Sequence, residues 1–511
     1  MLKKVIKNVR KVISFILTLI TFLILLTLLY YKKNFSDVSF EQLVFSILSS
    51  EGTSMGAVSE GIIFVVVFLL VSLFGTYFGM WLLRRHFNDV VLRVKFCKKE
   101  FNISLVPLNG FIVLLLNVSF FCLSVYYALD KIGYFEFLYF QNTSSNIFEE
   151  YYVDPKEVKL TFPKNKKNLI YIYVESLETS YVSDENGGKQ DKSYIPKLEE
   201  LALNNINFSN TDKLGGALCY GGSGWTIGAM VAHTAGVPLK LPLDEGNLYG
   251  ITGESVPGAY SIAEILSDNG YKNYFLMGSD GNFAGRKNYL LKHGFHEVYD
   301  YYTAIEKEWI PSDYYEWWGI EDKTLFEIAK ENLTEISKND EPFYYSMITT
   351  DTHFIDGYLE DNCPLNFDDQ YSNVLECNDS MVNKFIKWIS KQDFYKDTVV
   401  VVVGDHHTMQ PNFYSYMDKT RTIFNAYINT DIKTDYSKNR EFISMDYYPT
   451  TLAALNVKIE GDRLGLGTNL FSGKKTLTEE LGYENYIFEL DKKSFYYDNV
   501  ILGETYYDLE Y

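Results

Sequence analysis

Three long apolar runs in the first 130 residues constrain the fold of this chain more than any other feature. They cover Val12–Tyr30, Gly61–Leu83 and Asn109–Leu129. Each is close to the ~20 residues that a helix needs to cross the hydrocarbon core of a bilayer. The first run is too long for the apolar part of a signal peptide, and no small-residue cleavage site follows it. The sequence therefore predicts a three-helix transmembrane anchor.

Lysine and arginine are unevenly distributed among the segments that flank these runs. They gather before the first run and between the second and third runs, whereas the loop after the first run carries only Lys32 and Lys33 against four acidic residues. Basic segments are retained in the cytoplasm. We therefore expect a multi-pass protein of the cell membrane, with a cytoplasmic N-terminus and everything after Leu129 on the outer side.

The remaining chain is long enough to bury a sizeable core, since it runs from about Val153 to Tyr511. The formal net charge is −19, and no basic stripe appears. This balance argues against a nucleic-acid partner. It also has the wrong sign for binding anionic lipid, so the anchor must hold the outer domain at the membrane.

Strand-like and helix-like segments alternate through the outer domain. The strand-like segments are 169–174, 271–278, 343–350 and 399–403, and the helix-like segments are 195–204, 261–270, 324–338 and 372–391. The last strand contains five consecutive valines, which is typical of a strand buried on both faces. Alternation of this kind implies βαβ units. The sequence therefore predicts an α/β fold with a mostly parallel central sheet flanked by helices.

Acidic residues or histidines follow all four predicted strands. In chain order these residues are Glu175, Asp280, Asp351 with His353, and Asp405 with His406. Ligands in open α/β sheets bind at the carboxyl ends of the strands. Carboxylates and imidazoles are ligands of Mn²⁺ and Zn²⁺. The pattern predicts a metal site at this edge, with ordinary polar strand-to-loop junctions as the alternative.

A glycine-rich stretch, GGALCYGGSGWTIGAMVAHTAGVPL, runs into a helix-like segment that ends near Gly236. Trp225 and Thr226 fall in the first turn, where unpaired N–H groups and the helix dipole suit a phosphoryl group. A metal-activated hydroxyl there would be a nucleophile. Helix capping by Ser223 or Thr226 is the alternative. A lipase elbow, G-x-S-x-G, is excluded because Trp225 breaks the required spacing.

Six sequence blocks follow the apolar runs in a fixed order: VES, SGWTIGAMVA, FAGRKNYLLKHGF, TTDTH, GDHH and DYYPTTLAALNV. Together they resemble the phosphoglycerol transferases, the group of lipoteichoic acid synthase and osmoregulated periplasmic glucan phosphoglycerol transferase within the alkaline phosphatase/sulfatase superfamily. The resemblance implies a sulfatase-like catalytic domain over residues 165–475. The anchor would occupy 1–130, a linker 131–164, and a C-terminal extension packed on the catalytic domain 476–511.

The resemblance also implies roles for individual residues. The metal ligands would be Glu175, Thr226, Asp405 and His406, with Thr226 also the nucleophile. Arg286 would bind the phosphate and His353 the glycerophosphate, and both are candidate catalytic residues. Further candidates for substrate contacts are Asp280, Trp225 and His407, the last with a supporting or surface position as its alternative. Ala284 and Gly285 stand where the family has a tryptophan, so the contacts to the donor are expected to differ from those of the family.

The implied activity is transfer of glycerol phosphate from phosphatidylglycerol to an envelope glycan or teichoic-type polymer, through a phosphorylated threonine. One divalent ion is implied; Mn²⁺ suits the ligands best, and Mg²⁺ or Zn²⁺ is admitted. Phosphoethanolamine transfer or a related phosphodiesterase activity is the enzymatic alternative, and an envelope glycan-binding module is the non-enzymatic one. Formylglycine sulfatases are excluded, because neither Cys219 nor Ser223 lies in the required C/S-x-P-x-R context.

Three of the five cysteines lie in the predicted outer domain, on the oxidising side of the membrane. Cys363 and Cys377 flank a polar loop, and the sequence allows a local disulfide between them. Cys219 would then remain a thiol. Cys97 is expected in the cytoplasm and Cys122 in the third span.

Overall fold

The computed structural model describes residues 2–34, 40–48, 55–87, 91–96, 99–104, 106–240, 255–410, 413–414 and 421–503. The chain forms two compact units: Met1–Ser36 with Met55–Leu138, and Asp37–Ser54 with Tyr139–Tyr511. Cys97 and residues 504–511 of the predicted C-terminal extension lie outside the described residues.

The first unit is built from long helices and a hairpin. Its elements are α1 (Leu2–Asn34), α3 (Met55–Phe87), β1 (Val91–Phe96), β2 (Lys99–Ser104) and α4 (Val106–Lys131). Among the described residues, Asn8–Lys32 and Phe111–Lys131 are long and apolar enough to cross a membrane, whereas the apolar stretch of α3 is shorter, Phe64–Gly79. Two of the three predicted spans therefore meet this criterion, and the middle span stays a prediction.

The second unit contains a seven-stranded sheet. Its order is β5 (Gly216–Leu218), β10 (Thr422–Ile428), β9 (Thr398–Gly404), β4 (Asn168–Val174), β8 (Phe343–Ile348), β6 (Lys272–Met277) and β7 (Glu297–Tyr299). The strands from β9 to β7 run parallel, whereas β10 and β5 are antiparallel at one edge. The predicted α/β fold and the four predicted strands are confirmed, and the antiparallel edge makes the sheet mixed.

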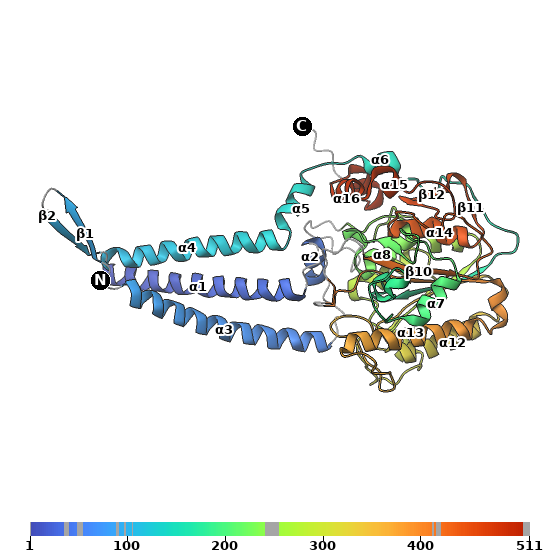
Figure 1. The fold of residues 1–511 in the computed structure, drawn as a ribbon, viewed down its shortest axis with the longest axis horizontal. Coiled ribbons are helices and arrows are strands. Elements are labelled where there is room, and N and C mark those ends of the chain that lie inside the picture. The colour runs from blue at the N-terminus through green and yellow to red at the C-terminus, as the bar shows by residue number, and fades with distance from the viewer. Residues whose placement is uncertain are drawn as a thin grey trace. The chain divides into compact units, whose positions relative to one another are not determined.

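Two layers of helices cover this sheet because its central strands are apolar on both faces. The layers contain α8 (Thr226–Ala235), α9 (Ile262–Asp268) and α14 (Tyr447–Ala454) on one side, and α7 (Pro196–Asn204), α12 (Asp322–Ile336) and α13 (Gln370–Ile389) on the other. Val401 of β9 packs into the first core and Val402 into the second. This alternation follows from the two-residue period of a strand, and Figure 1 shows the helices on opposite sides of β10.

Shorter elements complete the second unit. They are α2 (Phe40–Leu48), α6 (Ile147–Tyr151), β3 (Leu160–Thr161), α10 (Arg286–Lys292), α11 (Tyr301–Glu306), β11 (Lys458–Ile459), β12 (Arg463–Leu464), β13 (Gly467–Thr468), α15 (Leu477–Leu481) and α16 (Tyr483–Asp491); α5 (Tyr134–Gln141) spans the boundary between the units. Within the segment predicted as a linker, β3 pairs with β11. A disulfide joins Cys363 to Cys377, as the sequence allowed.

Candidate active site

The ends of two neighbouring strands bring the first candidate ligands together. β4 and β9 are parallel and in register, with Val174 opposite Gly404. Glu175 and Asp405 are the next residues of each chain segment, so the register places both at the same edge of the sheet. Both side chains are buried, as is His406.

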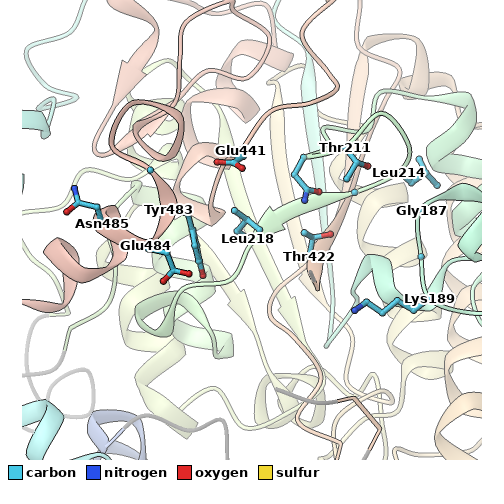
Figure 2. A pocket seen from close by; sticks show the side chains of 14 residues that line it. Gly187, Lys189, Thr211, Leu214, Leu218, Thr422, Glu441, Tyr483, Glu484 and Asn485 are labelled. Atoms are coloured by element: carbon cyan, nitrogen blue, oxygen red, sulfur yellow. The ribbon is translucent and has the colours of Figure 1, made fainter. Parts of the chain in front are cut away.

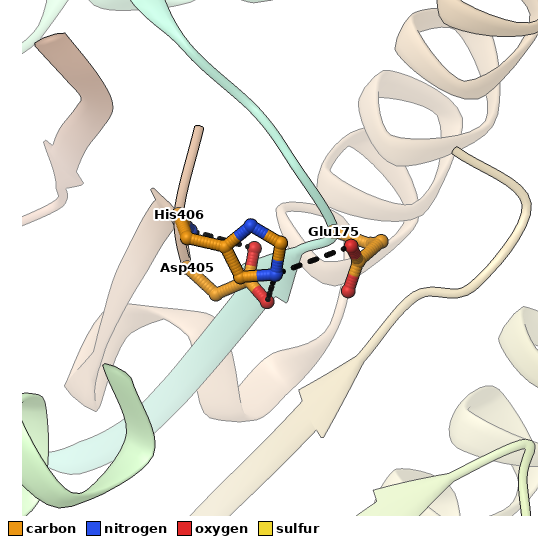
Figure 3. A group of neighbouring side chains, drawn as sticks. All are labelled: Glu175, Asp405 and His406. Atoms are coloured by element: carbon orange, nitrogen blue, oxygen red, sulfur yellow. Dashed lines mark hydrogen bonds and ion pairs between the residues drawn. The ribbon is translucent and has the colours of Figure 1, made fainter. Parts of the chain in front are cut away.

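The candidate ligand atoms surround one nitrogen of His406. Its Nε2 lies 3.4 Å from Oε1 of Glu175 and 3.3 Å from Oδ2 of Asp405 (Figure 3). Oγ1 of Thr226 lies 3.4 Å from the same nitrogen. The structure therefore brings all four predicted ligands together, although they come from three separate parts of the chain.

A backbone carbonyl sets the protonation of the His406 ring. Nδ1 lies 2.8 Å from the carbonyl oxygen of His407, so in the neutral ring Nδ1–H donates to that oxygen. Nε2 then carries a lone pair that faces the two carboxylates. This is the tautomer in which a histidine binds a metal through Nε2.

The charges at this site fit a divalent cation. Burial, and then the carboxylate of Glu175, raise the pKa of Asp405 above its ordinary value. Burial disfavours the charged form of His406, but the carboxylates of Asp405 and Glu175 outweigh it and raise the pKa of His406. Oδ2 of Asp405 is buried and accepts no hydrogen bond from the described residues. Buried like charges are costly without a counter-charge, and a cation bound by these oxygen and nitrogen atoms would supply one.

Asp405 is held rigidly by its second oxygen. Oδ1 accepts hydrogen bonds from the backbone N–H groups of Ser176 and His406, each at 2.8 Å. Ser176 also donates from Oγ to Oε1 of Glu175 at 2.8 Å. These contacts fix the orientation of both carboxylates relative to each other.

Thr226 is the first residue of α8, and the predicted helix end at Gly236 is confirmed. The N-cap position belongs to Trp225, whose side chain caps nothing, and Ser223 donates from Oγ to the carbonyl of Tyr220. The capping alternative is therefore not supported for Thr226 or Ser223. The hydroxyl of Thr226 instead points to His406 from the N-terminus of a ten-residue helix.

Arg286 begins α10 and is buried. Its Nη2 donates to Oγ of Ser279 and to the carbonyl of Asp280, both at 2.9 Å, and its Nε donates to the carbonyl of Phe283 at 3.1 Å. Burial lowers the pKa of Arg286 to about 10, while Glu175 and other acids oppose the shift. The guanidinium stays cationic at neutral pH, as a phosphate ligand requires.

Asp280 contributes to this arrangement mainly through its backbone. Its carbonyl accepts from Arg286, while its side-chain Oδ1 accepts from the N–H of Asn282 at 2.8 Å. The carboxylate thus stabilises the turn that leads to Arg286.

His353 follows β8 and lies half-buried. Its Nδ1 is 2.7 Å from the carbonyl oxygen of Phe354, and burial lowers its pKa to about 4. The ring is therefore neutral near pH 7, with the lone pair on Nε2. It can accept a hydrogen bond or a proton from a hydroxyl, but it carries no spare proton to give.

Trp318 is an aromatic neighbour of the site that the sequence did not single out. Its ring centroid lies 4.7 Å from that of His353 and 5.5 Å from that of Phe283. It thus stands beside the segment where Ala284 and Gly285 replace the tryptophan of the resembling family. The only sequence signal was the tryptophan pair at 317–318.

A buried ion pair supports the loop after His406, and no local sequence pattern indicates it. Arg421 donates from Nη2 and Nε to the two carboxylate oxygens of Glu178, at 2.7 and 2.8 Å. Glu178 accepts from the N–H of Thr408, and Arg421 donates to the carbonyl of Thr408. The side chain of His407 interacts electrostatically with this pair, and burial lowers the pKa of His407 to about 4.

The fold and site define a class of protein. A model of the sulfatase family matches residues 167–457, more than half of the chain. The chain belongs to this family. Curated relatives named phosphoglycerol transferase I, from Escherichia coli (strain 55989 / EAEC) and from Shigella boydii serotype 18, are each 32% identical over 337 residues. The match covers 64% of this chain and 41% of each relative, so the chain spans about two fifths of their length.

Solved structures of similar fold come from several bacteria. Lipoteichoic acid synthase LtaP from Listeria monocytogenes is 21% identical, with 62% of this chain and 79% of that chain covered and a TM-score of 0.48. Streptococcus pyogenes phosphoglycerol transferase GacH, in complex with sn-glycerol-1-phosphate, is 14% identical, with 59% and 84% covered and a TM-score of 0.40.

Proposed function

We propose that this chain is a membrane-anchored, extracytoplasmic phosphoglycerol transferase that moves glycerol phosphate from phosphatidylglycerol to an envelope glycan or polymer. One observation carries the proposal: the hydroxyl of Thr226, at the N-terminus of α8, lies 3.4 Å from the nitrogen around which Glu175 and Asp405 also gather. The names of the curated relatives support glycerol phosphate as the transferred group.

Glu175, Asp405, His406 and Oγ1 of Thr226 would hold one divalent ion, with Mn²⁺ best suited and Mg²⁺ or Zn²⁺ admitted. When bound, the ion lowers the pKa of a coordinated hydroxyl and neutralises phosphate charge. His406 would contribute Nε2, because the carbonyl of His407 accepts the Nδ1 proton.

In the first half-reaction Oγ1 of Thr226 attacks the phosphorus atom of the lipid. The hydroxyl of Thr226 releases its proton to water as the new bond forms. The bond from phosphorus to the diacylglycerol oxygen breaks, that oxygen takes up a proton from water, and a glycerophosphoryl ester remains on Thr226. Arg286 and the first N–H groups of α8 would donate to the non-bridging oxygens and stabilise the developing charge.

In the second half-reaction an acceptor hydroxyl attacks the same phosphorus atom, the bond to Oγ1 of Thr226 breaks, and Oγ1 takes back a proton from water. The neutral ring of His353, with Nε2 unprotonated, suits acceptance of the acceptor's proton or a hydrogen bond from the glycerol. Trp225, Asp280 and His407 remain candidates for supporting the substrate-binding surface.

The proposed location rests on the apolar helices and on the disulfide. α1 and α4 contain stretches that can cross a membrane, and disulfides persist in oxidising compartments. We propose an anchor over residues 1–130 and a catalytic domain over 165–475, with 131–164 joining them and 476–511 packed on the domain.

Trapping the covalent intermediate tests the function. Native protein given phosphatidylglycerol without an acceptor should gain a glycerophosphoryl mass on the tryptic peptide Leu214–Lys240, whereas Thr226→Ala should gain none and lose turnover by about a thousandfold or more. Melting temperatures should match, because Thr226 caps nothing. An adduct on Ser223 or Cys219 would contradict the nucleophile. An adduct formed from phosphatidylethanolamine instead would favour phosphoethanolamine transfer.

A further inference from the structure

A cavity of about 890 Å³ lies at the β5 edge of the sheet, and the steps proposed above leave it without a role (Figure 2). Leu218 and Thr422, from the paired ends of β5 and β10, lie between Tyr483 on one side and Lys189 on the other. Its volume is within the range of sites that hold small organic ligands.

The cavity lies beside the end of the sheet at which the parallel strands β4 and β9 terminate, and the candidate active site lies at that same end. Asn425 of β10 pairs with Val403 of β9, and beyond this pair Ile423 of β10 pairs with Glu178, three residues after Glu175. Thr422 of the cavity lining therefore adjoins the residue of β10 that pairs with the segment after Glu175. Arg421, next to Thr422, contacts Thr408 of the loop that follows His406.

The lining combines apolar and hydrogen-bonding groups. Leu218 and the ring of Tyr483 offer apolar surface, and the hydroxyl of Tyr483 is held by donating to the carbonyl of Cys219. Asn485 offers an amide beside them, and Glu441 and Glu484 offer carboxylates. Apolar rings complement the C–H faces of a sugar, while amides and carboxylates match its hydroxyls.

The charges of the lining discriminate between acceptors. Glu441 and Glu484 contribute two negative charges, and Lys189 contributes one positive charge. A polymer with a phosphate in every unit would meet net repulsion here, whereas an uncharged sugar would not.

We propose that this cavity binds the acceptor, and that the acceptor is an uncharged oligosaccharide rather than a polyglycerol phosphate chain. The inference rests on the proposed transfer reaction and narrows its acceptor class. The proposal also assigns a role to the antiparallel side of the sheet. Leu218, the last residue of β5, lines the cavity, and the chain continues from there through one short loop to Thr226.

Charge reversal on the exposed rim tests the proposal. The double variant Glu441→Lys, Glu484→Lys should weaken binding of a maltohexaose probe by about tenfold or more, because hydrogen-bond acceptors are lost. The same variant should bind polyglycerol phosphate more tightly than the native chain. Glu297→Lys, Glu460→Lys reverses two exposed carboxylates outside the lining and should change neither affinity.

Binding is measured by calorimetry on full-length protein in lipid nanodiscs, and the phosphatidylglycerol adduct is measured on the same samples. Equal maltohexaose affinity in both double variants and the native chain would overturn the cavity assignment, as would native binding of polyglycerol phosphate alone. Absence of the adduct in the native chain would overturn the transfer reaction instead. The binding data judge the cavity independently, because they need no turnover.

Discussion

Protonation of His406 on Nδ1 depends on one backbone carbonyl, that of His407, and it leaves Nε2 facing Glu175 and Asp405. The same device recurs at His353, where the carbonyl of Phe354 accepts the Nδ1 proton. In its neutral form each ring therefore presents the lone pair of Nε2 to the site. One lone pair lies among carboxylates and suits a metal, whereas the other lies beside Trp318 and suits a hydroxyl.

Replacement of Asp405 tests the metal site at the residue scale. Asp405→Asn can still accept from Ser176 and His406 through its oxygen, but it loses the charge at Oδ2. Metal affinity should fall by about a hundredfold or more with little change in melting temperature. Asp397→Asn, an exposed residue before the opposite end of the same strand, is the matched control. Equal metal content in both variants, measured by plasma mass spectrometry, would exclude Asp405 as a ligand.

His233 predicts a pH dependence of stability away from the site. It is fully buried on α8, and burial lowers its pKa from 6.5 to about 3. Between these values the unfolded chain binds a proton that the folded chain does not. Stability should therefore be complete above pH 6.5 and fall towards pH 3, by up to about 1.4 kcal/mol per pH unit from this residue.

Urea unfolding of His233→Asn across this pH range measures that contribution. The variant should show a shallower loss of stability in acid than the native protein, even if it is less stable overall. His296→Asn, at an exposed histidine, should keep the native slope more closely. If the free energy of unfolding of His233→Asn falls with pH as steeply as that of the native protein, other groups cause the loss of stability in acid.

At the scale of elements, the first turn of α8 depends on Gly228. A Cβ there would lie 2.5 Å from Nε1 of Trp225 and 2.8 Å from the carbonyl of Gly222. Alanine normally stabilises a helix by about 1 kcal/mol relative to glycine, but here it must displace Trp225, the residue before Thr226. Gly228→Ala should therefore reduce turnover by roughly tenfold or more, by moving the hydroxyl.

Gly221→Ala is the matched control, because nothing lies within 4 Å of the point that a Cβ at this residue would occupy. Its turnover should stay near the native value. Initial rates with labelled phosphatidylglycerol compare the two variants. Full activity of Gly228→Ala would show that the loop adjusts without moving Thr226.

The central strands could be predicted from sequence because each is apolar along its whole length and ends in polar residues. β5 could not, since it has only three residues and begins with glycine, and β10 places Asn425 in its interior. Asn425 is satisfied by the backbone of Phe208, a partner 217 residues away. Burial of a polar side chain through so distant a partner leaves no local pattern in the sequence.

Glu175, Asp405 and His406 could likewise be predicted as ligands, because parallel strands place their carboxyl ends together. The distances around Nε2 of His406 and the tautomers could not, as they depend on backbone atoms. The ion pair of Glu178 and Arg421 joins residues 243 positions apart, so no local sequence pattern predicts it. The roles assigned to Arg286, His353, Asp280, Trp225 and His407 stay predictions.

At the scale of the whole molecule, the expected orientation of the chain in the membrane can be tested with reporter fusions. A periplasmic-type phosphatase reporter fused after Tyr511 should be active, because that end is expected outside. The same reporter fused after Lys95, in the basic segment between the second and third spans, should be inactive. The opposite pattern in whole-cell phosphatase assays would reverse the proposed orientation.

The position of β9 in the sheet has a consequence for the synthesis of the protein. β9 lies between β4 and β10, yet β4 is made more than two hundred residues earlier, and Asp405 and His406 follow β9. A chain emerging from the ribosome thus contains Thr226 and Arg286 long before Asp405 and His406 can join them. The order of the strands thus delays assembly of the candidate site until the domain is nearly finished, and under the proposed mechanism Thr226 would stay inactive until then.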